Sequence, residues 1–310
     1  MPNFSLNPFS SPLLGLIQSI TPTKKEHHKI QSSLDQVSSY VNRLDSQNTV
    51  PILSNSPLLI VGSHSRDTDI LPITHVDVYL ELDPKNLTMQ DSGTTIQVLN
   101  DKESLSSCID QAHHLIPLKI IEQLQLLFSE KFSVELSHTK QTLKITVPHS
   151  SIQIRLTPSF QYNESFLIPQ VSSQLLWLPT NPNILKNLVN HVDEKHHGTI
   201  RPAIRFMKFW NDKKNNSAFR NCHIEMIFLL IFDEIPTPTS SVSECLTIFT
   251  DRMAKYIYNC PDPTKLNGPV HSYLPDSIDQ WYLFMNRIAE LKSALIHGES
   301  EVVRFAKKSD

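Results

Sequence analysis

Period-two alternation of apolar and polar residues predicts strands in the first half of the chain. The clearest case begins at residue 75, where valine or leucine at every second position faces one way and polar residues face the other. A short apolar run precedes it, and a β-meander follows later. The predicted strands are 58–61, 75–82, 132–136, 143–147 and 152–156.

Helical periodicity marks one segment near the N-terminus and most of the chain beyond residue 182. The predicted helices are 24–44, 108–129 with an interruption near Pro117, 184–196, 201–211, 222–232 and one from residue 277 onward. The segment 222–232 has almost no polar face, so we expect it to be central and buried.

These elements predict an α+β fold with three parts. Residues 1–22 are rich in proline and serine and are expected to be irregular. Residues 23–180 are expected to form a lobe with a mixed sheet, in which the polar stretch 84–105 is a loop. Residues 181–310 are expected to form a helical lobe, with a cleft between the two lobes.

The turn after the first strand has the composition of a phosphate-binding site. Gly62 and Ser63 end the apolar run 58–61, and the chain contains only six glycines. Glycine lets the main chain approach a phosphate closely, a hydroxyl adds a donor, and a following short helix offers its positive end. The next strand then presents His75 and Asp77 on its polar face.

Composition limits the classes of ligand and the cellular setting that we expect. The formal net charge is −3, which argues against bulk electrostatic binding of long nucleic acid, although a local basic groove would still be allowed, and a small ligand fits better. Four cysteines show no metal-ligand spacing, so reduced thiols are expected. Neither a secretory signal nor a membrane span is recognisable, and a cytoplasmic location is therefore expected.

The sequence around the glycine turn and several later blocks resemble a known protein family. Residues 62–82, GSHSRDTDILPITHVDVYLEL, resemble the motif of polymerase-beta-type nucleotidyltransferases, especially bacterial CD-NTases and oligoadenylate-synthase-like enzymes. Later blocks follow in the family's order, and the match covers about residues 58 to 300. Those blocks are 151–160, 166–169, 177–182 and 205–211. The resemblance implies a nucleotidyltransferase lobe, braced by the helix 24–44, beside a helical lobe.

The metal-binding half of the motif departs from the family. The resemblance implies three acids that hold two magnesium ions, and the matching positions here are His75, Asp77 and Arg155. Only Asp77 is acidic, and it is the one candidate metal ligand. A guanidinium about 4 Å from a divalent ion would cost several kcal/mol even at an effective dielectric constant near 20. Glu81 is too far along the strand to replace a lost acid.

Two interpretations of Arg155 remain open. It could contact a ligand phosphate in place of the metal, or form a structural ion pair with Asp77 in an empty site.

The helix from Arg201 carries a second candidate surface. Its residues Arg201, Arg205, Lys208 and Asp212 lie at helical spacing on one face. The resemblance implies that the lysine approaches nucleotide phosphates, whereas a solvated face with a Lys208–Asp212 pair is the alternative. The candidate nucleotide-binding residues are Gly62, Ser63, Arg66, Arg155, Arg205 and Lys208.

The leading hypothesis is a catalytically impaired nucleotidyltransferase-like protein that binds a nucleotide or a nucleotide-derived second messenger, in antiphage or nucleotide signalling. No cofactor is firmly implied. The first alternative is an active enzyme that makes linear or cyclic oligonucleotides from NTPs with magnesium or manganese, where His75 would favour manganese. The second is a protein-interaction module whose cleft is vestigial.

Overall fold

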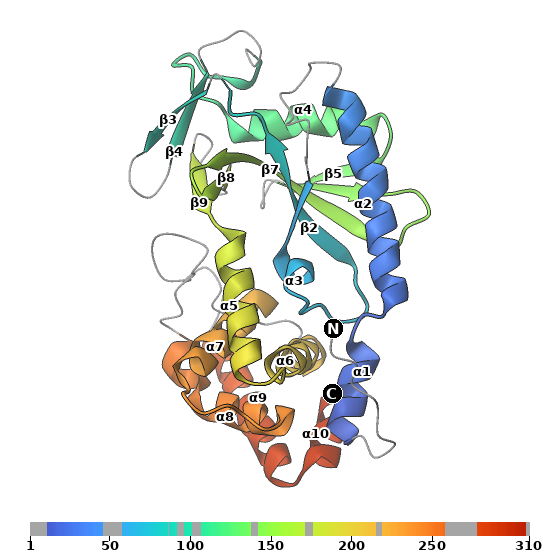
Figure 1. Ribbon diagram of the computed structural model, residues 1–310, viewed down its shortest axis with the longest axis vertical. Helices are drawn as coiled ribbons and strands as arrows, with labels where there is room; N and C mark the ends of the chain where they lie inside the picture. The colour runs from blue at the N-terminus through green and yellow to red at the C-terminus, as the bar shows by residue number, and fades with distance from the viewer. Residues whose placement is uncertain are drawn as a thin grey trace.

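The computed structural model describes two lobes, one built around a sheet and one wholly helical (Figure 1). It describes residues 11–45, 58–85, 87–91, 96–100, 107–137, 142–170, 176–214, 219–257 and 278–307. The α+β class expected from the sequence is confirmed. Within these residues, no helix is long and apolar enough to span a bilayer.

Nine strands of the described chain form one mixed sheet. The main path runs in the order β1-β2-β7-β8-β9-β4-β3, and β6 joins β7 to β5. Strands β2 and β7 are parallel and all other pairs are antiparallel. The strands are β1 (Leu58–Val61), β2 (His75–Leu82), β3 (Leu87–Asp91), β4 (Ile96–Asn100), β5 (Ser133–Ser137), β6 (Thr142–Thr146), β7 (Gln153–Tyr162), β8 (Ser165–Pro169) and β9 (Trp177–Thr180).

One face of the sheet is covered and the other is polar. On β2 the even-numbered residues are buried and the odd-numbered residues are partly exposed, as the alternation predicts. The buried face packs with helices α2 (Lys24–Asp45) and α4 (Pro117–Ser129) into one hydrophobic core. The opposite face of β2 carries His75, Asp77, Tyr79 and Glu81, so we call it the open face.

The helical lobe has a separate hydrophobic core. Its central helix is α7, whose residues from His223 to Leu229 are all buried, as the nearly continuous apolar run predicts. The helices are α1 (Pro12–Ile20), α5 (Pro182–Lys195), α6 (Ile200–Lys214), α7 (Asn221–Glu234), α8 (Val242–Tyr256), α9 (Ile278–Ile296) and α10 (Glu299–Lys307).

The expectation that residues 1–22 are irregular is wrong for the part described. Residues 12–20 form α1, which begins with the Ser11 side chain accepting a hydrogen bond from Leu14 N and with a proline in its first turn. Its apolar side, including Leu13 and Leu16, is buried in the core of the helical lobe. The first helix of the chain therefore belongs with the C-terminal half.

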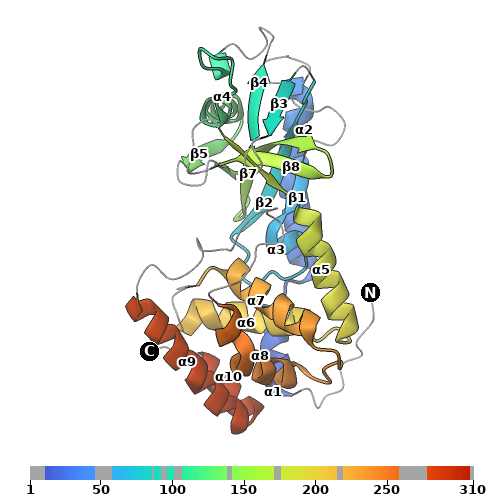
Figure 2. The same cartoon turned by 90° about the vertical axis from the view of Figure 1, so that its left-hand side faces the viewer.

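Two local expectations also need correction. The stretch 84–105, expected to be a loop, contains the antiparallel hairpin of β3 and β4, which Figure 2 shows at the end of the sheet lobe remote from the helical lobe. The helix expected over 108–129 begins only at Pro117, because the preceding residues form isolated bridges with their neighbours. Proline at the start of a helix is favourable, so Pro117 starts this helix rather than interrupting it.

Candidate functional site

The glycine of the phosphate-cradle motif lies directly against Asp77. Gly62 follows β1 and starts the short helix α3 (Gly62–Ser65). Its φ is +72°, and a Cβ placed on it would lie 2.8 Å from Oδ2 of Asp77. Only glycine fits both the left-handed backbone and this close approach. The two halves of the motif, turn and acid, are therefore packed together.

Arg155 lies beside Asp77 across the parallel pair of β2 and β7. The register aligns Asp77 with Arg155 and His75 with Gln153, and both arginine and aspartate are on the open face. In the part of the chain that the structure describes, the two form no ion pair, and Nε of Arg155 is buried without a hydrogen-bond partner. The structural ion pair, one of the two interpretations of Arg155 left open by the sequence, is therefore not formed.

This donor set does not fit a magnesium site. Magnesium takes oxygen ligands, and among the acidic positions that the resemblance implies only Asp77 supplies a carboxylate. His75 Nδ1 lies 3.0 Å from the Thr74 hydroxyl oxygen. No group of three or more potential metal ligands is found among the described residues.

A second cation extends the charged row across the sheet. Lys144 on β6 is in register with Arg155, and Glu135 on β5 is in register with Lys144. Lys144 Nζ lies 3.4 Å from a carboxylate oxygen of Glu135, and both side chains are solvent-exposed to a large extent, so this pair is weak. The open face thus presents two neighbouring cations, Arg155 and Lys144, next to Asp77.

The hydroxyl of the cradle already donates to an acid of its own loop. Ser63 Oγ donates to Asp69 Oδ1 at 2.5 Å, and His64 Nδ1 lies 2.6 Å from Asp69 Oδ2. Although burial raises the pKa of Asp69, the hydrogen bonds from His64 and Ser63 outweigh it and hold that pKa below its usual value. A phosphate at Ser63 would therefore meet a neighbouring carboxylate.

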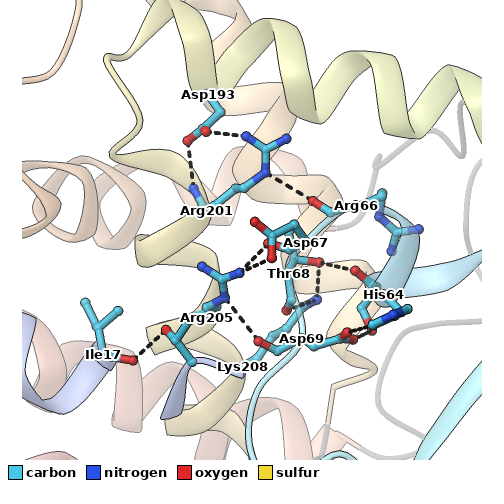
Figure 3. Close-up of polar contacts among 12 residues, drawn as sticks. Ile17, His64, Arg66, Asp67, Thr68, Asp69, Asp193, Arg201, Arg205 and Lys208 are labelled. Atoms are coloured by element: carbon cyan, nitrogen blue, oxygen red, sulfur yellow. Dashed lines mark hydrogen bonds and ion pairs between the residues drawn. The ribbon is translucent and has the colours of Figure 1, made fainter. Parts of the chain in front are cut away.

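The basic face of α6 binds the backbone of this loop (Figure 3). Arg201 Nε donates to the carbonyl of Arg66 at 3.1 Å. Arg205 donates to the carbonyls of Asp67 and Asp69 and pairs with the Asp67 carboxylate at 2.6 Å. Lys208 donates to the carbonyl of Thr68 at 3.0 Å. Three cations on successive turns thus hold four consecutive residues, 66–69.

A buried cluster of four residues completes this attachment. We call Arg66, Thr68, Lys208 and Glu225 the Glu225 cluster. Glu225 accepts two hydrogen bonds from Arg66 and one from Thr68, and it forms an ion pair with Lys208 at 2.7 Å. Glu225 is 0% exposed. Burial raises its pKa, but the neighbouring Arg66 and Lys208 cations more than offset this and lower the pKa to about 2.

Apart from Ser63, whose hydroxyl donates to Asp69, the predicted binding residues separate into two groups. Gly62 and Arg155 adjoin Asp77 at the sheet, as expected. Arg66, Arg205 and Lys208 are buried beneath the loop with protein partners. Neither the solvated face nor the Lys208–Asp212 pair is found, since Lys208 pairs with Glu225. A direct role for these three cations in nucleotide binding stays a prediction.

Glu225 and Lys144 were not predicted from the sequence as site residues. The signal for Glu225 was present, because it is the one acid within the apolar run 222–232, and a buried acid needs a cationic partner. Lys144 alternates with buried Leu143 and Ile145, so its placement on the polar face could be predicted, but its register with Arg155 could not.

Comparison with known proteins supports the same fold. No family model matches the chain. A curated relative, a probable cyclic nucleotide synthase of Bacillus cereus (strain VD146), is 21% identical over 239 residues, covering 73% of this chain and 71% of the relative.

Two solved structures are similar over nearly the whole chain. A chain of the CdnC:HORMA-deltaN complex of E. coli MS115-1 has a TM-score of 0.68 at 12% identity, covering 96% of this chain and 95% of that chain. A structure of E. coli MS115-1 CdnC with ATP has a TM-score of 0.67 at 11% identity, covering 95% of each chain.

The fold is therefore nucleotidyltransferase-like. More narrowly, the chain has the CD-NTase fold, and the resemblance found in its sequence is confirmed at the level of that fold.

Proposed function

We propose that this protein is a catalytically impaired CD-NTase-like nucleotidyltransferase that binds a nucleotide or nucleotide-derived second messenger without a catalytic metal pair. The observation that carries the proposal is the register of Asp77 with Arg155. It puts a permanent cation where the resemblance implies an acidic metal ligand. The setting proposed is antiphage or nucleotide signalling in the cytoplasm.

The state of Arg155 supports phosphate binding over a structural role. Its Nε is buried and has no hydrogen-bond partner among the described residues, and a buried unpaired donor is costly. A phosphate oxygen accepts from guanidinium in a charge-assisted bond. Lys144, in register on the next strand, adds positive charge to the same face. A ligand phosphate bound at this face would balance the positive charge of Arg155 and Lys144.

Ligand binding with and without divalent metal tests this proposal. ATP, GTP and cyclic dinucleotides are titrated into the wild type by calorimetry, with magnesium, manganese or EDTA. We expect wild-type binding in EDTA, because Arg155 supplies the charge. Arg155→Gln should weaken it about 10- to 100-fold, the loss of one charge-assisted bond. A double variant, His75→Asp with Arg155→Asp, should bind only with metal.

The curated relative's name favours an active enzyme as the second candidate. In that case the wild type would release pyrophosphate from an NTP with magnesium or manganese, and Asp77→Ala would abolish the release. Such a result would overturn the proposal of impaired catalysis, whereas gain of activity in the double variant alone would support it.

A protein partner is proposed alongside the ligand, because one similar structure is a complex with a HORMA protein. The nucleotide-bound protein would then act through that partner.

A further inference from the structure

The open face of the sheet carries an aromatic pair one step from the Asp77–Arg155 row. Tyr79 follows Asp77 by two residues on β2, so both side chains face the same way. Phe166 on β8 meets the Tyr79 ring edge to face, with ring centroids 6.0 Å apart and an interplanar angle of 61°. Both side chains are partly exposed.

This pair is not part of either hydrophobic core. The clusters of buried residues, and the partly buried residues packed on them, include neither Tyr79 nor Phe166. The neighbours of Tyr79 on the open face are Leu59 of β1 and Thr157 of β7, and both are partly exposed. The aromatic pair thus lies at a partly exposed position on the open face, beside the charged row.

The spacing suits one nucleoside. Tyr79 lies two residues along β2 from Asp77, the register partner of Arg155, which is a separation of roughly 6.6 Å parallel to the strands. Arg155 is on the neighbouring strand, about 4.8 Å away perpendicular to the strands. A ribose bridges a comparable gap between a base and its 5′-phosphate. Edge-to-face rings form a corner in which a third flat ring can stack on one and contact the edge of the other.

We infer that Tyr79 and Phe166 form a stacking site for the base of a nucleotide whose phosphate contacts Arg155. This inference rests on the proposed function, and it adds the residues that would contact the base of the nucleotide. Stacking is tolerant of base identity, because every base has a flat π-face, so the site selects a nucleotide over a bare polyphosphate. Arg155 and Lys144 contact the phosphate, and Tyr79 and Phe166 contact the base.

The experiment compares ATP with inorganic tripolyphosphate, which lacks the base, both in EDTA and measured by calorimetry. Tyr79→Leu should weaken ATP binding about tenfold, the lower range of one lost stacking contact, and leave tripolyphosphate unchanged. Tyr79→Phe should retain ATP affinity, because the ring is kept. Arg155→Gln should weaken both ligands.

Phe166→Leu provides a second, independent variant, with the same expected selectivity as Tyr79→Leu. The matched control is Tyr282→Leu, an exposed tyrosine on α9 of the helical lobe, which should change neither ligand. Melting temperature and unchanged tripolyphosphate binding confirm that each variant is folded.

The negative results of this experiment distinguish failure of the aromatic site from failure of the proposed function. If the wild type binds ATP but Tyr79→Leu and Phe166→Leu leave it unchanged, or weaken both ligands equally, the aromatic site is overturned and the proposed function stands. If the wild type binds neither ATP nor tripolyphosphate, the aromatic site is overturned, and the proposed function is overturned as well only if GTP and the cyclic dinucleotides also fail to bind.

Discussion

Glu225 shows how much a single buried carboxylate organises here. It is the common acceptor for Arg66 and Thr68 from the loop after β1 and for Lys208 from α6. With one partner removed, the remaining charges would be buried without compensation, which costs far more than an exposed pair contributes. The residue lies outside the motif, yet it holds the motif's loop in place.

Glu225→Gln should therefore destabilise the protein in a pH-dependent way. The pKa of Glu225 falls from 4.5 in the unfolded chain to about 2 in the folded one, which corresponds to ~3 kcal/mol of stability. That contribution is complete above the unfolded pKa and is lost as pH falls from 4.5 towards 2. Urea unfolding should show wild type and variant far apart at pH 7 and converging near pH 3.

Asp233→Asn is the matched control on the same helix, because Asp233 is exposed and lies 3.8 Å from His191. It should change the free energy of unfolding by less than about 0.5 kcal/mol. A Glu225→Gln effect that is the same at both pH values would contradict the role of the ionised carboxylate.

Gly62→Ala should disturb both halves of the motif at once. The left-handed backbone alone costs an alanine roughly 1–2 kcal/mol, and the added methyl group must also displace the Asp77 carboxylate. Thermal unfolding should report the loss. Gly15→Ala is the opposite control, since Gly15 is helical with nothing within 4 Å, and it should stabilise α1 by about 0.5–1 kcal/mol. An unchanged melting temperature in Gly62→Ala would show that the turn can relax.

At the scale of the element, α6 has a structural role that was not predicted from the sequence. Helical spacing correctly predicted that Arg201, Arg205 and Lys208 share a face. Spacing alone cannot say what lies opposite that face, and the answer is the backbone of residues 66–69. The strands of the meander were predictable from alternation. By contrast, β3 is a mostly polar edge strand, and β4 offers only a short alternation, with buried Ile96 and Val98 on either side of Gln97.

The helix α1 offers a paired test of packing. Leu13 is 0% exposed in the core of the helical lobe, and its neighbour Leu14 is 40% exposed. Leu13→Ala should cost about 2–5 kcal/mol because it leaves a cavity, while Leu14→Ala should cost less than about 0.5 kcal/mol. Equilibrium unfolding in urea measures both, and equal small effects would mean that α1 is not docked as described.

At the scale of the whole molecule, the fold was predictable to a greater extent than the connections between its lobes. The motif residues and the period of each segment were enough for a mixed sheet followed by helices. The docking of α1 on the C-terminal half was not, because residues distant in sequence leave no local pattern. The cleft expected between the lobes stays a prediction.

The position of α1 has a mechanical consequence. The chain passes between the lobes twice, once from α1 to α2 near Thr21 and once from β9 to α5 near Asn181, on opposite sides of the view in Figure 1. Two covalent links restrict a relative rotation of the lobes more than a single link would. The cations of α6 belong to the helical lobe and hold the backbone of residues 66–69, so any change in the angle between the lobes would be transmitted to the turn that begins at Gly62.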